Sequence, residues 1–256
     1  MLGAIAGDVI GSVYEGRSPV AKDFPLFHPK CEFTDDTVMT VAVAEALRSG
    51  GDYARHLRDW GTRYPNRGYG LMFNRWLKDE SMGPYNSFGN GSAMRCSPAA
   101  WAFDDLASVL SEAKRTADAS HNHPEGVKGA QAVAAAIWLA RHGNSKEVIR
   151  YRVEDFGYSC RSSLAQFRAT IGFDETCQGT VPPAIVAFLD STDFEDAIRN
   201  AVSLGGDTDT LACITGSIAE PFYGGVPAEI SQRTWSLLDD DLRRVVSDFR
   251  TFYRIP

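Results

Sequence analysis

Two short acidic motifs, far apart in the chain, each stand at the start of an apolar, helix-forming run. The first is Thr34-Asp35-Asp36 and the second is Gly-Gly-Asp-Thr-Asp-Thr at 205–210. Together they offer four carboxylates and, as candidate ligands, the hydroxyls of Thr34 and Thr210. Grouped carboxylates repel one another unless a cation or a proton separates them. One or two divalent ions would hold such a group near neutral pH, and ligands that are all oxygen favour Mg²⁺, Mn²⁺ or Ca²⁺ over zinc. The motifs therefore predict a metal-dependent enzyme.

A helix N-cap is the simpler explanation for each motif, because threonine and aspartate cap helices and acidic residues favour a helix N-terminus. Two adjacent aspartates exceed what a cap needs, and the run after Asp36 is too apolar for a solvated surface helix. In the second motif, Gly205 and Gly206 allow a tight turn. The apolar run from Leu211 to Ile214 predicts a buried helix, so its acidic start would lie at or near the interior. Unpaired carboxylates are costly there, which favours metal binding over capping. The ligand spacing of an EF-hand is absent.

Helical periodicity dominates the chain, and runs with the alternation of a β-strand are scarce. No repeat, low-complexity stretch or linker divides the sequence. We therefore predict that residues 1–256 form an all-α fold, a single compact orthogonal multi-helix domain with a dinuclear metal site. Gly3, Gly7 and Gly11 share one face of the first helix, which indicates close packing against another helix. Helices are expected over 1–14, 36–48, 52–63, 104–119, 125–143, 160–170, 194–202, 208–219 and 240–252, and loops near 17–33, 64–70, 81–95 and 172–181.

Composition and charge argue against several classes of protein. The formal net charge is −7 and the pI is near 5.3, and no basic patch or arginine-rich run is present, so general nucleic-acid binding is not expected. Five scattered cysteines without a Cys-x-x-Cys pair argue against a disulfide framework or a zinc module and indicate a reducing cytosol. The sequence shows no leader pattern and no apolar run of about 20 residues. We expect a cytoplasmic protein with no membrane span, and a monomer because no feature indicates an interface.

Five motifs in order carry a family resemblance: Gly-Asp-x-x-Gly-Ser-x-Tyr-Glu at 7–15, Thr-Asp-Asp at 34–36, Gly-Tyr-Gly at 68–70, Gly-Asn-Gly-Ser-Ala-Met-Arg at 89–95 and Gly-Gly-Asp-Thr-Asp-Thr at 205–210. With these motifs the chain resembles an ADP-ribosylglycohydrolase of the dinitrogenase-reductase-activating type, from residue 3 to about residue 224. The resemblance implies an all-α fold, two Mg²⁺ (or Mn²⁺) ions, and cleavage at the ribose anomeric carbon that joins ADP-ribose to a modified side chain. The metal ligands that it implies are Thr34, Asp35, Asp36, Asp207, Asp209 and Thr210.

Three acidic residues receive catalytic roles from this resemblance. Glu15 by itself would be an exposed glutamate at a helix end, but in the motif it matches the family's acid near the metals and the scissile bond. It would orient substrate or water, or gate the site. Asp36 or Asp209 would orient the attacking water. Asp8 is expected to be a structural hydrogen-bond partner between helices, and Arg95 to meet a phosphate or form a structural salt bridge.

The segment 86–95 is rich in glycine, asparagine and serine, which suits backbone amides that face a diphosphate. An ordinary polar turn is an equal alternative from the residues alone. By resemblance to the serine-directed hydrolases of the family, Ser87 and Asn90 would contact phosphate or ribose. Phe88 stands where that subgroup has tyrosine and would stack on adenine, and His121 would contact the diphosphate region. The substrate-binding residues implied are Gly70, Ser87, Phe88, Gly89, Asn90, Gly91, Ser92, Met94 and His121.

The leading hypothesis is a metal-dependent hydrolase that acts on an ADP-ribosylated protein or another ADP-ribosylated acceptor and releases ADP-ribose. Two alternatives stay open: another metal-assisted phosphoester hydrolase, such as a phosphatase or nucleotidase, and a catalytically inactive ADP-ribose-binding protein. The product separates the first two, and binding without turnover would indicate the third. The sequence leaves open whether the acceptor is arginine, serine, a nucleobase or a small molecule, and whether the ions are Mg²⁺ or Mn²⁺.

Overall fold

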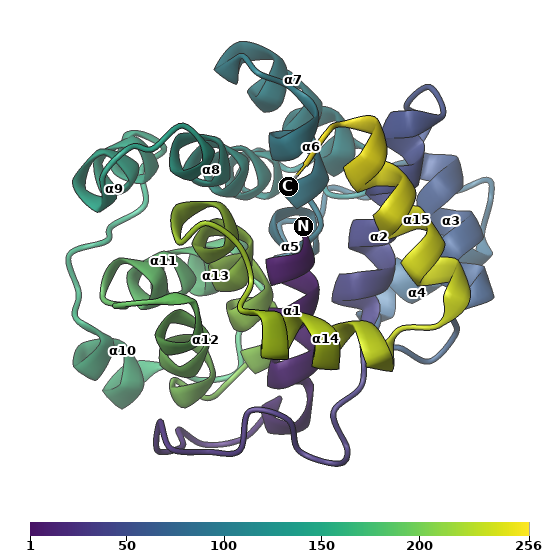
Figure 1. Cartoon of the computed structure of the whole chain (residues 1–256). Helices are drawn as coiled ribbons and strands as arrows, with labels where there is room; N and C mark the ends of the chain where they lie inside the picture. The colour runs from purple at the N-terminus through teal and green to yellow at the C-terminus, as the bar shows by residue number, and fades with distance from the viewer. Residues whose placement is uncertain (256) are drawn as a thin grey trace.

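Helices make up the fold of residues 1–255, which are the residues that the computed structural model describes (Figure 1). No β-strand occurs among them, although two isolated β-bridges do, Arg17 with Gly206 and Gly89 with Thr176. The prediction of an all-α class is confirmed. The elements are α1 (Leu2–Gly11), the 3₁₀ helix η1 (Ser12–Tyr14), α2 (Asp35–Arg48), α3 (Tyr53–Arg63), α4 (Leu71–Lys78), α5 (Gly91–Met94), α6 (Ser97–Ala102), α7 (Leu106–Asp118), α8 (Pro124–Arg141), α9 (Lys146–Asp155), α10 (Leu164–Thr170), α11 (Cys177–Leu189), α12 (Phe194–Ser203), α13 (Thr208–Phe222), α14 (Ala228–Leu237) and α15 (Asp240–Phe252).

The centre of the fold is the contact between α1 and α13, two helices from opposite ends of the chain. Every residue of α1 is buried. The predicted glycine stripe makes the contact close: a Cβ placed on Gly7 would lie 2.0 Å from the carbonyl oxygen of Ala212, and one on Gly3 would lie 2.2 Å from that of Gly216. Because no side chain fits between the two backbones, the end of α1 and the start of α13 are held at a fixed separation.

The other helices surround this central pair. Helix α2 packs against α1, α3, α6 and α15, while α8 packs against α13, α7 and α9. Helices α11 and α12 lie against α13, and α14, from the C-terminal part of the chain, crosses α1 (Figure 1). The result is one compact domain. No helix within residues 1–255 is long and apolar enough to cross a membrane.

Several boundaries differ from the sequence prediction. The expected loop at 172–181 is wrong from Cys177 onward, where α11 begins, and the expected loop at 81–95 contains the short helix α5. The sequence prediction also lacks helices α4, α6, α9, α11 and α14. Helix α11 contains Pro182 and Pro183, residues that remove backbone donors and usually argue against a helix interior. Its side chains from Thr180 to Phe188 are buried, so packing outweighs the low propensity.

Candidate active site

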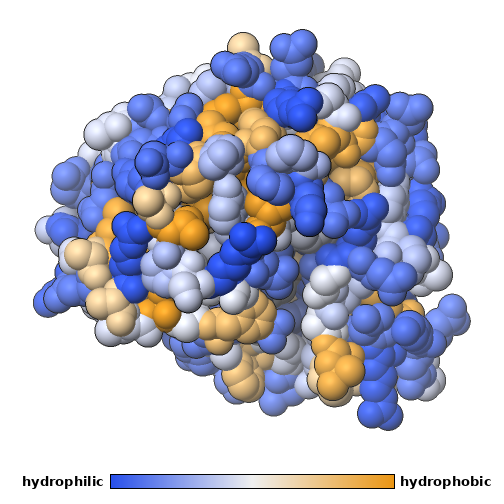
Figure 2. Space-filling model, turned by 90° about the horizontal axis from the view of Figure 1, so that it is seen from below, coloured by the Kyte–Doolittle hydropathy of each residue, from blue (hydrophilic) through white to orange (hydrophobic). Residues whose placement is uncertain are grey.

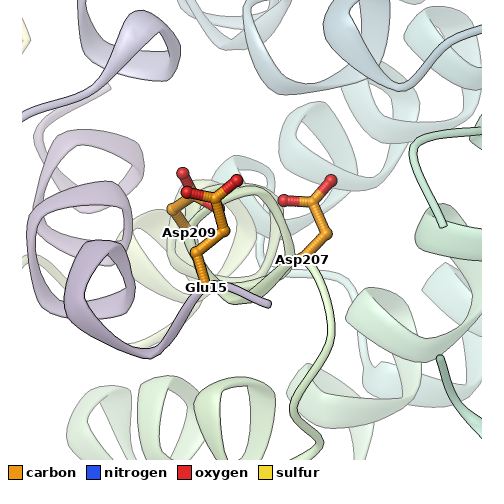
Figure 3. A group of neighbouring side chains, drawn as sticks. All are labelled: Glu15, Asp207 and Asp209. Atoms are coloured by element: carbon orange, nitrogen blue, oxygen red, sulfur yellow. The ribbon is translucent and has the colours of Figure 1, made fainter. Parts of the chain in front are cut away.

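Three carboxylates from distant parts of the sequence meet between the segment after α1 and the start of α13. Glu15 follows η1, whereas Asp207 is the N-cap of α13 and Asp209 lies in its first turn. One oxygen of each lies within 4.8 Å of the other two, and all three side chains point to the same side of the ribbon (Figure 3). Asp207 and Asp209 are buried, while Glu15 stays open to solvent. The structure thus brings together Glu15, a predicted catalytic residue, Asp207, a predicted ligand, and Asp209, for which both roles were predicted.

A small β-bridge positions Glu15 beside the second motif. The amide of Gly16 donates to the carbonyl of Gly206 at 2.8 Å, and the amide of Gly206 donates to the carbonyl of Arg17 at 3.0 Å. Gly205 and Gly206 have φ angles of 78° and 74°, in the left-handed region that favours glycine. A side chain there would also strike the backbone, since a Cβ on Gly205 would lie 2.7 Å from the nitrogen of Pro19. The two glycines of the motif are therefore needed to place Glu15.

The first motif opens α2 and is fixed by Asp8 of α1. The Asp8 carboxylate accepts hydrogen bonds from the amide of Thr34 at 3.0 Å and from its hydroxyl at 2.7 Å, and from both the amide and the hydroxyl of Thr37. Asp8 is the inter-helix partner that was predicted. Thr34 Oγ1 also caps α2 by accepting from the amide of Asp36. Thr210 Oγ1 donates to Asp36 Oδ2 at 3.2 Å, which joins the two motifs.

The carboxylates of both motifs destabilise one another's charge. Burial, followed by repulsion from neighbouring carboxylates, raises the pKa of Asp35, Asp36 and Asp209 well above the usual range. Burial also raises the pKa of Asp207, against hydrogen bonds that lower it. For Glu15 the pKa is raised by burial first and then by the charge of Asp207. A nearby positive charge would stabilise the charged form of these groups.

A divalent cation fits this donor set. The candidate ligands offer oxygen atoms alone, which suits Mg²⁺ or Mn²⁺. Asp36 Oδ1 is buried and has no hydrogen-bond partner among the described residues, and an unpaired carboxylate oxygen in the interior is costly. A bound cation would remove that cost and the mutual repulsion.

The acidic cluster forms one end of a pocket of about 620 Å³. The pocket wall includes Asp35, Asp36, Asp207, Asp209, Thr210 and Glu15. It also includes eight of the predicted substrate-binding residues, which are Gly70, Ser87, Phe88, Gly89, Asn90, Gly91, Met94 and His121. Two predicted residues do not line this pocket. The hydroxyl of Thr34 donates to Asp8 instead, and the hydroxyl of Ser92 donates to the carbonyl of Gly126 at 2.7 Å.

The glycine-rich loop is bound to the start of α11 and to the acidic cluster. Asn90 donates from its amide nitrogen to the carbonyl of Glu175 at 2.7 Å, and Cys177 donates to the carbonyl of Phe88 at 3.0 Å. The side-chain amide of Asn90 donates to Asp207 Oδ2 at 2.7 Å and to Thr180 Oγ1 at 2.9 Å. This loop is therefore more than a polar turn, because Asn90 fixes it relative to the carboxylates.

Arg95, at the end of this segment, forms no salt bridge with any described residue. The prediction of a structural salt bridge is therefore wrong. Its side chain is fully buried beside the pocket and donates to the carbonyl of Thr116 and the hydroxyl of Ser120. The reason is local: the guanidinium lies against α7 and the turn after it, where backbone and hydroxyl oxygens are its acceptors.

Sequence reasoning missed much of the pocket mouth. Exposed apolar side chains of Leu71, Met72 and Phe173 line it, together with Phe88, and Leu71 is 86% exposed. The carboxyl of Glu175 lies near Asp207, whose charge adds to burial in raising its pKa. In the sequence, the only indication of this part of the pocket is an apolar residue followed by two acidic residues at 173–175. Figure 2 shows separate hydrophobic patches on a largely hydrophilic face of the molecule.

The fold and the pocket define a helical protein in which carboxylates that suit a cation adjoin a glycine-rich loop. Known proteins are similar to this chain in sequence and in fold. It is 27% identical over 305 residues to ADP-ribosylhydrolase ARH3 of Homo sapiens, covering 88% of this chain and 84% of the relative. It is 27% identical over 277 residues to ADP-ribosylarginine hydrolase Tri1 of Pseudomonas putida (strain GB-1), covering 92% and 73%. A solved chain titled "ADP-ribosylglycohydrolase-related protein complex" matches with a TM-score of 0.74 at 27% identity, over 99% of this chain and 96% of that one.

The chain belongs to the ADP-ribosylglycohydrolase family, whose model matches residues 1–253. The resemblance inferred from five ordered motifs is confirmed. Family membership supports the hydrolysis of ADP-ribose linkages as the class of reaction.

Proposed function

We propose that this protein is a divalent-metal-dependent hydrolase that cleaves the glycosidic bond between ADP-ribose and a modified acceptor, and that it acts in the cytoplasm as a monomer. One observation carries the proposal: a single pocket of about 620 Å³ holds a repelling carboxylate cluster and, next to it, a glycine-rich loop tied to that cluster by Asn90. A substrate with a ribose between a diphosphate and a leaving group matches these two halves.

The carboxylates of both motifs would hold the metal. Asp36, Asp207 and Asp209 offer buried oxygens, and Asp35 lies on the pocket wall beside them. Thr34 and Thr210 complete the proposed ligand set, although in this structure their hydroxyls donate to Asp8 and Asp36. When bound, two Mg²⁺ or Mn²⁺ ions supply Lewis-acid stabilisation and fix the orientation of hydroxyl groups.

Glu15 is suited to move a proton. Its side chain is accessible to solvent at the pocket, while partial burial and then the charge of Asp207 raise its pKa, which makes it a better base than an ordinary glutamate. We assign to Glu15 the acceptance of a proton from the attacking water. Asp36 and Asp209, each within the same wall, would orient that water.

The loop at 87–91 and its surroundings would hold the ADP part of the substrate. The ring of Phe88 is 47% exposed at the pocket mouth and can stack on adenine. Ser87, Asn90 and His121 would contact the diphosphate and ribose. Glycines at 89 and 91 keep this wall free of side chains, so that the backbone can approach the ligand.

The test is ADP-ribose release, measured by mass spectrometry, from a panel of ADP-ribosylated arginine, serine and nucleic-acid substrates with Mg²⁺ or Mn²⁺. We expect release from at least one substrate, lost on chelation. Asp209→Asn should lower the rate at least about 10²-fold, while Asp59→Asn, at an exposed acid of α3, should not change it. Release of inorganic phosphate instead would indicate a phosphoester hydrolase, and ADP-ribose binding without turnover a binding protein. An Asp209→Asn protein with full activity would refute the assigned roles.

A further inference from the structure

The buried arginine beside the pocket has an unusual set of partners. Arg95 is 0% exposed, and its Nη2 donates to the carbonyl oxygen of Thr116 at 2.8 Å and to Ser120 Oγ at 2.9 Å. Its Nε and Nη1 have no hydrogen-bond partner among the described residues, and no carboxylate there forms an ion pair with it. A buried guanidinium without a counter-ion is costly, which indicates a use for its charge and its donors.

Ser120 links Arg95 to His121 through its hydroxyl group. Ser120 Oγ lies 2.8 Å from His121 Nδ1. A guanidinium can only donate, so Ser120 Oγ accepts from Arg95. Among the described residues, the Ser120 hydroxyl proton then has one acceptor within hydrogen-bond distance, His121 Nδ1. If the hydroxyl donates to Nδ1, that nitrogen carries no proton. The neutral imidazole then carries its proton on Nε2.

The other ring nitrogen faces the glycine loop. A Cβ placed on Gly91 would lie 3.0 Å from His121 Nε2, and one on Gly89 would lie 3.4 Å from it. His121 is 5% exposed and lines the pocket, and Nε2 makes no hydrogen bond with the described residues. The ring centroids of Phe73 and Tyr85 lie 6.0 Å and 5.8 Å from that of the imidazole, so aromatic neighbours limit its rotation.

We propose that Arg95 and Ser120 are positioning residues that hold His121 as the Nε2–H tautomer, so that His121 donates a hydrogen bond to an oxygen of a diphosphate bound along the 89–91 loop. This inference rests on the proposed function for the identity of the ligand. It goes further in assigning the tautomer and the two residues that set it. Arg95 acts through Ser120 in this assignment, because its Nη2 donates to Ser120 Oγ.

The electrostatic surroundings agree with a neutral donor. Burial and the charge of Arg95 lower the pKa of His121 well below its usual value, so the ring is uncharged near neutral pH. Burial lowers the pKa of Arg95 to about 10, so its side chain stays charged near neutral pH. The pocket therefore has carboxylates at one end and a buried positive charge behind the loop at the other. A ligand with a diphosphate would orient accordingly.

The first test reads the tautomer directly in the ligand-free protein. Two-bond ¹H–¹⁵N correlation spectra of the imidazoles are recorded, and His121 is identified among the five histidines by the signal lost in His121→Gln. We expect the Nε2–H form in the unmodified protein, and a mixture or the Nδ1–H form in Ser120→Ala. An Nδ1–H tautomer in the unmodified protein, or an unchanged tautomer in Ser120→Ala, would overturn the proposal. This result does not depend on what the substrate is.

The second test is a double-mutant cycle on ligand affinity, measured by calorimetry with ADP-ribose and Mg²⁺. Ser120→Ala should weaken binding about tenfold, which corresponds to about 1.4 kcal/mol. In the His121→Gln background the same change should cost less than about twofold, because a glutamine amide keeps a donor near the place of Nε2 and has no tautomer to set. Equal losses in both backgrounds would show that Ser120 acts through packing alone and would refute the relay.

Two controls separate the relay from general damage. Adenosine lacks a diphosphate, so its affinity should be the same in Ser120→Ala and the unmodified protein; a matching loss would contradict the assigned contact. Ser217→Ala removes a buried hydroxyl that donates only to the carbonyl of Ile214 within α13, and it should leave ADP-ribose affinity unchanged. If ADP-ribose does not bind the unmodified protein, the proposed function fails, and pyrophosphate then replaces it as the ligand for the same cycle.

Discussion

Replacing Gly11 by alanine should damage the site through the backbone alone. Gly11 is the last residue of α1, and a Cβ there would lie 2.5 Å from the carbonyl oxygen of Thr208 and 2.6 Å from the Cα of Asp209. Both atoms belong to the backbone and cannot rotate away. The two helix ends would have to separate by about 1 Å to restore ordinary van der Waals contact. That displacement falls between Glu15 and Asp209, which share the carboxylate cluster.

The magnitude follows from two separate effects. Overpacking of this kind costs about 1–3 kcal/mol of unfolding free energy, which lowers the melting temperature by about 2–4 °C per kcal/mol in a chain of this size. A misplacement of about 1 Å at a reacting centre can cost about 10²-fold in rate. We therefore expect Gly11→Ala to lose about two orders of magnitude in kcat and to bind Mg²⁺ more weakly, while it stays folded at room temperature.

Thermal unfolding with increasing Mg²⁺, together with ADP-ribose release, measures both effects. Gly83→Ala is the neutral control, because a Cβ there meets nothing within 4 Å. Gly7→Ala is the matched control, because it clashes with the same helix at Ala212 but farther from the carboxylates. It should lower stability at least as much with a smaller loss of Mg²⁺ affinity. If Gly11→Ala keeps the stability and Mg²⁺ affinity of the unmodified protein, the close contact of α1 with α13 does not position Glu15.

Further outcomes follow from charge and burial. Burial raises the folded-state pKa of Asp35 and Asp36 above the unfolded value, so the folded state binds extra protons. The unfolding free energy of the metal-free protein should therefore fall as pH rises from about 5 to about 8. In a thermal-shift titration, Mg²⁺ should raise the melting temperature more at the upper pH. Asp36→Asn should raise the metal-free unfolding free energy at about pH 8 by about 1 kcal/mol and abolish most of the Mg²⁺ response; a lower metal-free stability in urea unfolding would contradict the repulsion. Phe88→Ala should raise KM about tenfold with little change in kcat or melting temperature, since its ring is half-exposed; steady-state kinetics check this. Asp8→Ala should cost about 3 kcal/mol in urea unfolding, because four donors of Thr34 and Thr37 lose their acceptor.

The acidic motifs and the glycine stripe could be predicted because each is a local pattern with a physical cause. Asp36 and Asp209 stand at the starts of helices that continue with mainly apolar residues, so burial of those helices carries the carboxylates inward. Gly3, Gly7 and Gly11 recur at helical spacing, and the structure places them against the backbone of α13. Patterns of this kind need no knowledge of the rest of the chain.

Other parts of the site depend on contacts that no local pattern encodes. Helix α11 begins at Cys177 although it contains two prolines, because the burial of its side chains outweighs the free-energy cost of proline in a helix. The bond between Asn90 and Asp207 joins segments that are distant in sequence. The acceptors of Arg95 are a backbone carbonyl and a hydroxyl, and their availability follows only from how α7 ends. Charge pairing was the natural expectation for this arginine, but the fold gives it oxygens that are neutral.

Close backbone contacts hold the carboxylate cluster together against the repulsion of its members. Repulsion among its members favours separation of α1 from α13 in the metal-free protein. Close glycine packing at Gly7 and the β-bridge between Arg17 and Gly206 oppose that separation. The β-bridge places the backbone next to Glu15 beside the second motif, so it helps to keep Glu15 close to Asp209. Changes that loosen the helix pair should therefore lower cation affinity before they unfold the chain, because the repulsion acts at the end of the pair where opening costs least.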